Sequence, residues 1–223
     1  IIKGLADYTK GNRFFRPESS YGMPKARLFG NAALSFITKV SCGYWHIMDP
    51  SNGYTAIHVS VLKELPIDKF EKRYFFETDM LFRLNTIRAV VKDIPMDAVY
   101  ADEESNLNIR KILPEFSKKH LIRLGKRYFY KYLLRDFNLG SLYSIFGLIL
   151  FLFGVFFGMT QWISSSMQHK VASSGTVMLA ALPTLVGIQF IIAFLQYDIS
   201  STPKEPLSTT LAESMDLSST DMG

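Results

Sequence analysis

Two long segments of the sequence contain no Asp, Glu, Lys, Arg or His residue: residues 137–168 and residues 171–197. A helix needs about 20 predominantly apolar residues to cross the hydrocarbon core of a bilayer. Each segment is long enough for one crossing, and we expect spans at residues 139–163 and 176–197. Two buried helices of a soluble domain are the alternative, but a chain of 223 residues leaves too little sequence to bury them. The sequence therefore predicts a two-helix transmembrane hairpin within residues 138–198.

A basic segment, residues 110–137, precedes the first apolar run. It holds nine Lys and Arg against two Asp and Glu, a net charge of +7 in a chain whose total is +5. Lys and Arg near the ends of a span favour the cytoplasmic side of a membrane. We therefore expect a multi-pass protein of the cell membrane, with the water-facing part and both termini in the cytoplasm.

The basic segment also has a helical periodicity. Apolar and aromatic residues between Leu121 and Tyr132 recur at spacings of three and four. We expect an amphipathic helix on the membrane surface, with Lys126, Arg127 and Lys131 directed at anionic head groups. Nucleic-acid binding is another use of a basic run rich in aromatic residues. Because the segment leads directly into a membrane span, the lipid bilayer is the expected partner, and no nucleic acid is expected.

The two ends of the chain differ from the middle in composition. Residues 199–223 contain ten Ser and Thr and two Pro residues, which predicts a disordered tail. The N-terminal residues lack the charged and apolar regions of a secretory signal. Since the sequence opens with Ile-Ile rather than Met, we expect it to be a fragment of a longer protein.

Residues 1–109 form the water-facing part. The expected elements are a short strand over residues 1–5 and the Tyr8 region, a helix over residues 24–40, a β-like stretch at 42–49, a strand followed by a helix over 54–65, a helix capped by Thr78 or Asp79, and a strand pattern over 89–94 and 95–100. Strands that alternate with helices indicate an α/β fold class. The single cysteine, Cys42, excludes a disulfide framework and a cysteine-rich zinc site.

Two short features of the water-facing part carry groups suited to binding or catalysis. The first is KGNRF, residues 10–14, in which a glycine allows close backbone approach and Arg13 suits phosphate oxygens. The second is DPSNGYTA, residues 49–56, in which Asp49 lies beside a tight turn. Asp49 is either an acidic group used in chemistry or the side chain of an Asx turn.

Two further features carry carboxylates. In FFETDM, residues 75–80, Glu77 and Asp79 stand at the expected start of a helix. A carboxylate there serves as a general base or only as a helix cap, and both interpretations remain open. In DEESNL, residues 102–107, Ser105 follows three acidic residues, and a solvated acidic loop is the simpler interpretation.

The order and spacing of these features resemble the C-terminal half of family 2 glycosyltransferases that use polyprenyl phosphate. These are the dolichyl-phosphate mannose synthase-like enzymes with two C-terminal membrane helices. KGNRF resembles their GSRY-type element, and DPSNGYTA is similar to their DPTSGFRA-type element. YFFETDMLFRL stands where they have an aromatic run before an acidic helix start, and DIPMDAVYADEESNL resembles their EVPI…R…GESKL segment. The resemblance extends over residues 1–198.

The resemblance implies a partial GT-A, Rossmann-like domain in residues 1–109. It also implies transfer of a sugar from a nucleotide-sugar to polyprenyl phosphate at the cytoplasmic membrane face. Family members hold Mg²⁺ or Mn²⁺ at an Asp-x-Asp motif, which this sequence lacks. We therefore expect the main metal ligands in a missing N-terminal half, and an isolated chain that is inactive.

The candidate site residues follow from the features and the resemblance together. Arg13 is the phosphate-binding candidate, Asp49 and Asp79 are the catalytic candidates, and Glu77 and Ser105 are the acceptor or loop candidates.

Two other functions remain open at this point. A non-catalytic, membrane-anchored binding module is compatible with the lack of an Asp-x-Asp motif. A glycosyltransferase with a hydroxyl acceptor on a glycan would need a general base, for which Asp79 is suited. Assembly into a homo-oligomer is also open.

Overall fold

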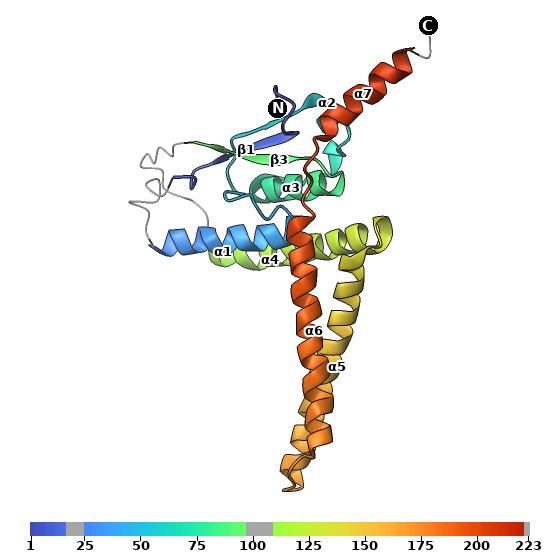
Figure 1. Cartoon of the computed structure of the whole chain (residues 1–223). Helices are drawn as coiled ribbons and strands as arrows, with labels where there is room; N and C mark the ends of the chain where they lie inside the picture. The colour runs from blue at the N-terminus through green and yellow to red at the C-terminus, as the bar shows by residue number, and fades with distance from the viewer. Residues whose placement is uncertain (17–24, 97–108, 221–223) are drawn as a thin grey trace. The chain divides into compact units, whose positions relative to one another are not determined.

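The computed structural model describes residues 1–16, 25–96 and 109–220 (Figure 1). The chain divides into two compact units. The sheet unit comprises Ile1–Phe129 and Thr202–Gly223, and the hairpin unit comprises Tyr130–Ser201. Each unit is described by itself.

The described residues of the sheet unit form a three-stranded sheet in the order β2-β1-β3. They are β1 (Tyr8–Asn12), β2 (Thr55–Ile57) and β3 (Val91–Pro95). β1 pairs antiparallel with β2 and parallel with β3, and Figure 1 shows β1 and β3 side by side. A parallel pair needs a long connection, which here includes three α-helices. The mixed α/β character is thus confirmed, as are strands at Tyr8, after residue 54 and at 91–95. The expected strand at residues 1–5 is wrong, and residues 97–100 lie outside the described residues.

The helices between β1 and β3 are α1 (Lys25–Cys42), α2 (Val59–Lys63) and α3 (Phe76–Thr86), with single 3₁₀ turns η2 (Ile67–Lys69) and η3 (Arg73–Phe75). α3 begins at Phe76, so the expected cap at Thr78 or Asp79 is wrong. Asp79 lies inside the first turn and is fully buried. Its Oδ2 accepts hydrogen bonds from the Glu71 N–H and from Arg83 Nε instead of capping α3.

The expected β-like stretch at residues 42–49 contains no strand. Two of its side chains instead bond to the β3 segment: Tyr44 Oη donates to the Ala89 carbonyl at 2.6 Å, and His46 Nε2 lies 2.8 Å from the Val91 carbonyl oxygen. Side-chain hydrogen bonds therefore fix this stretch without a backbone ladder.

The core of the sheet unit is a cluster of buried apolar residues from β1, β3, α2, α3 and the residues after α1. Its fully buried members include Tyr8, Ile47, Val61, Leu81, Leu84 and Val91. Full burial of one such aliphatic side chain stabilises a fold by about 1.5–3 kcal/mol. This core supports the ends of β1 and β3, where the Arg13–Asp49 pair lies.

The tail contains a helix, α7 (Leu207–Thr220), so the expectation of disorder over residues 199–223 is wrong for residues 207–220. Asp7 caps this helix: its Oδ2 accepts the Leu207 N–H and its Oδ1 accepts the Ser208 N–H, both at 2.8 Å. Leu207 and Leu211 pack against the core. Composition alone missed α7 because the cap and the apolar surface come from residues about 200 positions earlier in the chain.

The expected helix in the basic segment is confirmed as α4 (Ile109–Tyr128), followed by the π-helical turn η4 (Phe129–Arg135). Leu121 on this helix is 68% exposed, whereas His120, Arg123 and Arg127 are buried, so the expected availability of Arg127 to head groups is wrong. The buried residues find polar partners on the rest of the sheet unit, and those partners decide which face of α4 points inward.

Two of the three cations assigned to lipid head groups also have partners within the protein. Arg127 Nη2 donates to the Val40 carbonyl at 2.9 Å. Lys131 Nζ lies 3.1 Å from Asp198 Oδ1 within the hairpin unit. Lys126 is exposed, as expected.

The hairpin unit consists mainly of α5 (Leu139–Met167) and α6 (Ser174–Ser200), which lie side by side in Figure 1. Both are long and apolar enough to cross a bilayer, with mean hydropathies of 2.3 and 2.2. α6 extends beyond its expected span at both ends, and α5 extends beyond its expected span at the C-terminal end. The helices pack closely, since a methyl group on Gly154 would overlap Thr184 and one on Gly187 would overlap Phe151.

Candidate functional site

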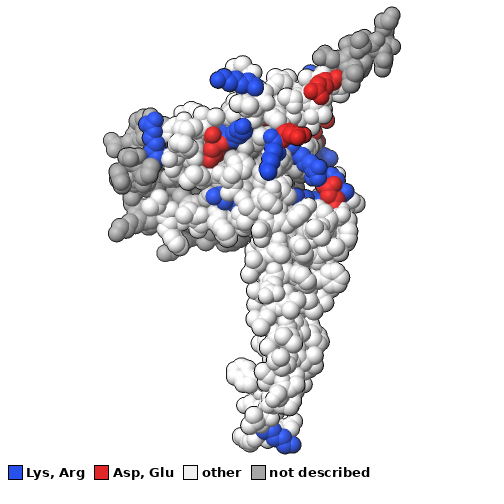
Figure 2. Space-filling view, in the orientation of Figure 1, with Lys and Arg blue, Asp and Glu red and all other residues white. Residues whose placement is uncertain are grey.

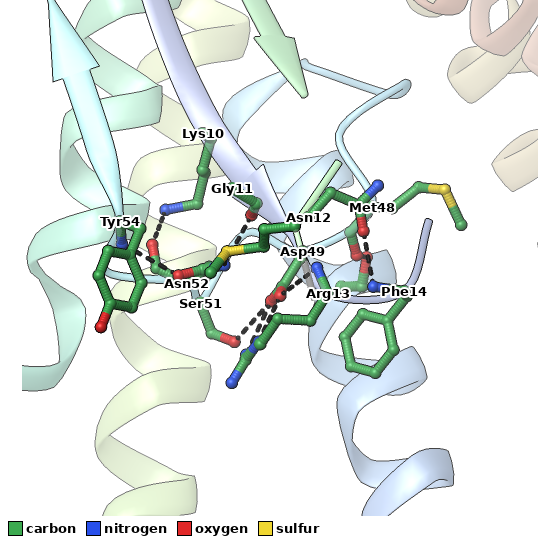
Figure 3. Close-up of polar contacts among 12 residues, drawn as sticks. Lys10, Gly11, Asn12, Arg13, Phe14, Met48, Asp49, Ser51, Asn52 and Tyr54 are labelled. Atoms are coloured by element: carbon green, nitrogen blue, oxygen red, sulfur yellow. Dashed lines mark hydrogen bonds and ion pairs between the residues drawn. The ribbon is translucent and has the colours of Figure 1, made fainter. Parts of the chain in front are cut away.

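The first two sequence features meet at the end of β1. Arg13 Nε lies 2.7 Å from Asp49 Oδ2, and Arg13 Nη2 donates to Asp49 Oδ1 at 3.0 Å (Figure 3). The Asp49 side chain is 1% exposed and that of Arg13 is 27% exposed. Two parallel charge-assisted hydrogen bonds fix the plane of the guanidinium as well as its position. Arg13 is therefore an oriented cation at the edge of a buried carboxylate.

A second set of bonds joins the two features through Asn52. Its side-chain Nδ2 donates to the Gly11 carbonyl at 2.8 Å, and its backbone carbonyl accepts from Lys10 Nζ at 2.5 Å (Figure 3). The Gly11 N–H donates to the Tyr54 carbonyl at 2.9 Å. A methyl group on Gly11 would overlap the Met96 sulfur and the Asn52 amide. The glycine is thus needed for close approach within the protein.

Lys10 is a buried cation that the sequence reasoning did not single out. Burial lowers the pKa of Lys10 to about 8. The carboxylates that oppose this shift belong to Glu77, Asp49 and Asp93. The sequence signal that could have found Lys10 is its position in β1, because Tyr8, Lys10 and Asn12 are two residues apart and share one face of the strand.

Asp93 is a second group that the sequence reasoning missed. It stands opposite Lys10 in the parallel register of β1 and β3. Its Oδ2 accepts from Asn12 Nδ2 at 2.9 Å and from the Met48 N–H at 2.8 Å. Burial raises the pKa of Asp93, while the Met48 bond opposes that shift. Asp93 therefore ties the residues before Asp49 to β1.

Asp79 belongs to a different cluster, which joins α3 to α4. Its Oδ2 accepts from Arg83 Nε at 2.9 Å and from the Glu71 N–H at 3.0 Å. Its Oδ1 lies 2.7 Å from Arg123 Nε. Glu71 completes the cluster through ion pairs of 3.1 Å with Arg123 and Lys119. The guanidinium groups of Arg83 and Arg123 therefore neutralise the charge of Asp79. Asp49 is not part of this cluster.

The remaining two candidates are Glu77 and Ser105. The charge of Glu77 opposes the lowering of the Lys10 pKa by burial. Glu77 also lines a cavity of about 600 Å³ with Glu71, Arg73 and Phe76. Ser105 lies outside the described residues.

A groove runs between α1 and the residues that follow Arg13. Its volume is about 390 Å³, and its apolar wall includes Phe14, Leu28 and Phe36. Arg16 and Lys39 also line it. The groove thus combines an apolar wall with two cationic side chains, and it starts at the residue after Arg13.

The described residues do not fit the Mg²⁺ or Mn²⁺ that the resemblance implies. Within residues 1–16, 25–96 and 109–220, no group of three or more His, Cys, Asp or Glu side chains could hold a metal ion. The carboxylates of Asp49 and Asp79 already bond to guanidinium groups. No reaction step is therefore assigned to a metal held by these residues.

Comparison with known proteins identifies one informative similarity. The chain is 29% identical over 128 residues to UDP-N-acetylglucosamine–dolichyl-phosphate N-acetylglucosaminyltransferase of Methanococcus voltae. The match covers 56% of this chain and 51% of that protein, so the chain spans about half the length of this curated relative. No family model matches the chain. No solved structure matches it either.

Proposed function

We propose that the protein is a membrane-anchored family 2 glycosyltransferase with a GT-A domain that transfers a sugar from a nucleotide-sugar to a polyprenyl phosphate. The reaction would take place at the cytoplasmic membrane face. The observation that carries the proposal is the oriented Arg13 guanidinium, followed in the chain by Phe14, which lines a groove with apolar and cationic walls. The relative from Methanococcus voltae, named for transfer of N-acetylglucosamine to dolichyl phosphate, supports the same class of acceptor.

The groove matches the two parts of a polyprenyl phosphate. An isoprenoid chain is apolar and suits a wall that includes Phe14, Leu28 and Phe36. A phosphate group suits the guanidinium groups of Arg13 and Arg16, because planar N–H donors pair well with phosphate oxygens. A hydrophilic acceptor would gain little from the apolar wall.

In the proposed reaction, an oxygen of the acceptor phosphate forms a bond to the anomeric carbon of the sugar. The bond from that carbon to the nucleotide breaks, and the nucleoside diphosphate leaves with the electron pair. A phosphate monoester has a second pKa of about 6, so it is largely dianionic at pH 7 and needs no strong base. Arg13 would orient the phosphate and stabilise its charge.

The contacts of the carboxylates support positioning roles. Asp49 would hold the guanidinium plane of Arg13, and Asp79 would hold α4 against α3. A hydroxyl acceptor would instead require a general base with an available carboxylate. Because both candidate carboxylates bond to guanidinium groups, the phosphate acceptor is favoured. Glu77, whose charge opposes the lowering of the Lys10 pKa, remains the candidate for an acceptor or loop contact.

The test uses the full-length protein in membranes with a labelled nucleotide-sugar. We expect label in an organic-soluble product when polyprenyl phosphate is supplied, and release of that label by mild acid, which cleaves a sugar phosphate. Label that appears only in a glycan would favour the hydroxyl acceptor. Binding of nucleotide-sugar without transfer to any acceptor would favour the non-catalytic module.

A further inference from the structure

A second groove lies within the hairpin unit, between the C-terminal half of α5 and the N-terminal half of α6. Its volume is about 980 Å³, and apolar residues such as Val155, Ala180 and Leu185 line it. These residues belong to helices that are long and apolar enough to cross a bilayer. A groove at that depth faces hydrocarbon, so its occupant must present an apolar surface.

The end of this groove near the interhelical loop is polar. Ser165, Ser166, His169 and Lys170 line it there. Figure 2 shows the hairpin as white along its length, with basic atoms at its loop end. Between Asp136 and Asp198 the sequence contains no Asp or Glu, and Lys170 is the single Lys or Arg there. The hairpin therefore brings no carboxylate of its own to this cation.

We propose that this groove binds an anionic phospholipid of the leaflet on the loop side. One acyl chain lies along the apolar wall, and the phosphate pairs with Lys170 and accepts hydrogen bonds from the neighbouring serine hydroxyls. A cation at head-group level attracts anionic lipid, and the effect is worth roughly 1 kcal/mol per Lys or Arg, or about fivefold in binding.

A second copy of the hairpin fits the groove less well. The copy would carry the same loop, with a Lys and no acidic residue at this end. It would therefore place like charges together or leave Lys170 without a counter-ion. An anionic lipid supplies both the apolar surface and the missing negative charge.

The test uses the full-length protein in detergent micelles with phosphatidylglycerol or phosphatidylcholine of the same acyl chains, and native mass spectrometry counts the lipids retained. We expect phosphatidylglycerol to be retained about fivefold more strongly, and Lys170→Gln to abolish that preference. Lys63→Gln, which removes an exposed charge from α2, is the matched control and should keep it. Ala181→Phe, which fills the groove without a charge change, should lower retention of both lipids.

Equal retention of the two lipids by the unmodified protein would overturn the proposal, as would an unchanged preference in Lys170→Gln. Displacement of phosphatidylglycerol by an equimolar polyprenyl phosphate would also overturn it, by assigning the groove to a substrate. A dimer in which a second copy excludes lipid from the groove would also overturn the proposal. If Lys170→Gln does not fold, high salt on the unmodified protein screens the same ion pair and should remove the preference.

Discussion

The guanidinium of Arg13 and the carboxylate of Asp49 form a two-pronged ion pair, with N–O distances of 2.7 and 3.0 Å, across 36 residues of sequence. The pair joins KGNRF to DPSNGYTA and leaves Arg13 partly exposed beside the groove along α1. In this geometry the cation is available to a ligand while the carboxylate is not. The predictions below separate these two roles.

Arg13→Lys should lower transfer activity by about 10²-fold in the full-length protein, because lysine keeps the charge but not the two-pronged geometry. Folding should be retained. The measurement is kcat/KM for polyprenyl phosphate together with thermal melting. Arg135→Lys is the matched control, since Arg135 is 29% exposed and pairs with Asp136 at 3.4 Å. Near-normal activity of Arg13→Lys would remove Arg13 from the site.

Asp49→Asn should reduce both stability and activity, because the oriented guanidinium loses its anionic partner. We expect a destabilisation of about 1–3 kcal/mol, below the value for a fully buried pair because Arg13 is partly exposed. Denaturant unfolding and kcat/KM measure the two effects. In a positioning role, the double variant with Arg13→Lys should be scarcely less active than Arg13→Lys alone. A large further loss would instead indicate that Asp49 acts as a base.

Asp79→Asn should destabilise the packing of α4 on α3 by about 3 kcal/mol, because Arg83 and Arg123 lose a buried counter-charge. Hydrogen exchange of α4 should accelerate, and the variant that remains folded should keep most of its activity. Asp68→Asn, on the exposed 3₁₀ turn η2, is the control and should change neither property. Loss of activity with normal hydrogen exchange in α4 would restore the general-base interpretation.

His120 should make the stability of the sheet unit depend on pH. Burial lowers the pKa of His120 to about 4, whereas an unfolded histidine titrates near 6.5. Between these values the unfolded chain binds the extra proton, so the free energy of unfolding falls as the pH drops from about 7 to 4. The expected loss is about 3 kcal/mol at most.

Denaturant unfolding across that pH range measures the His120 effect. His120→Asn, which keeps a polar group near Ser41, should flatten the pH dependence. His58→Asn is the control, because His58 lies at the start of α2 and outside the α1–α4 contact, and it should leave the slope unchanged. An equal slope in His120→Asn and the unmodified protein would contradict the prediction.

Asp7→Ala should release α7, because Asp7 accepts the N–H groups of Leu207, Ser208 and Val90. Loss of a helix cap costs about 0.5–2 kcal/mol. Limited proteolysis should then cut within residues 207–220 at least several-fold faster, and mass spectrometry of the fragments locates the cut. Asp68→Ala is the control. An unchanged rate of cleavage would mean that α7 is held by its apolar contacts alone.

The sequence by itself determined the elements that depend on local pattern. The lengths of the two uncharged runs predicted α5 and α6, and short local sequence patterns predicted strands at β1, β2 and β3. These features follow from periodicity and from the thickness of a bilayer, which need no knowledge of distant contacts.

Only the tertiary structure decided which charges point inward and what they meet. Arg123 and Arg127 belong to a basic segment that suits a lipid surface, yet they are buried because Asp79 and the Val40 carbonyl lie opposite them. Likewise, α7 forms where composition predicted disorder, because Asp7 supplies its cap. A buried polar group requires a partner, and such partners lie far away in the sequence, so their pairing depends on how the chain brings distant residues together.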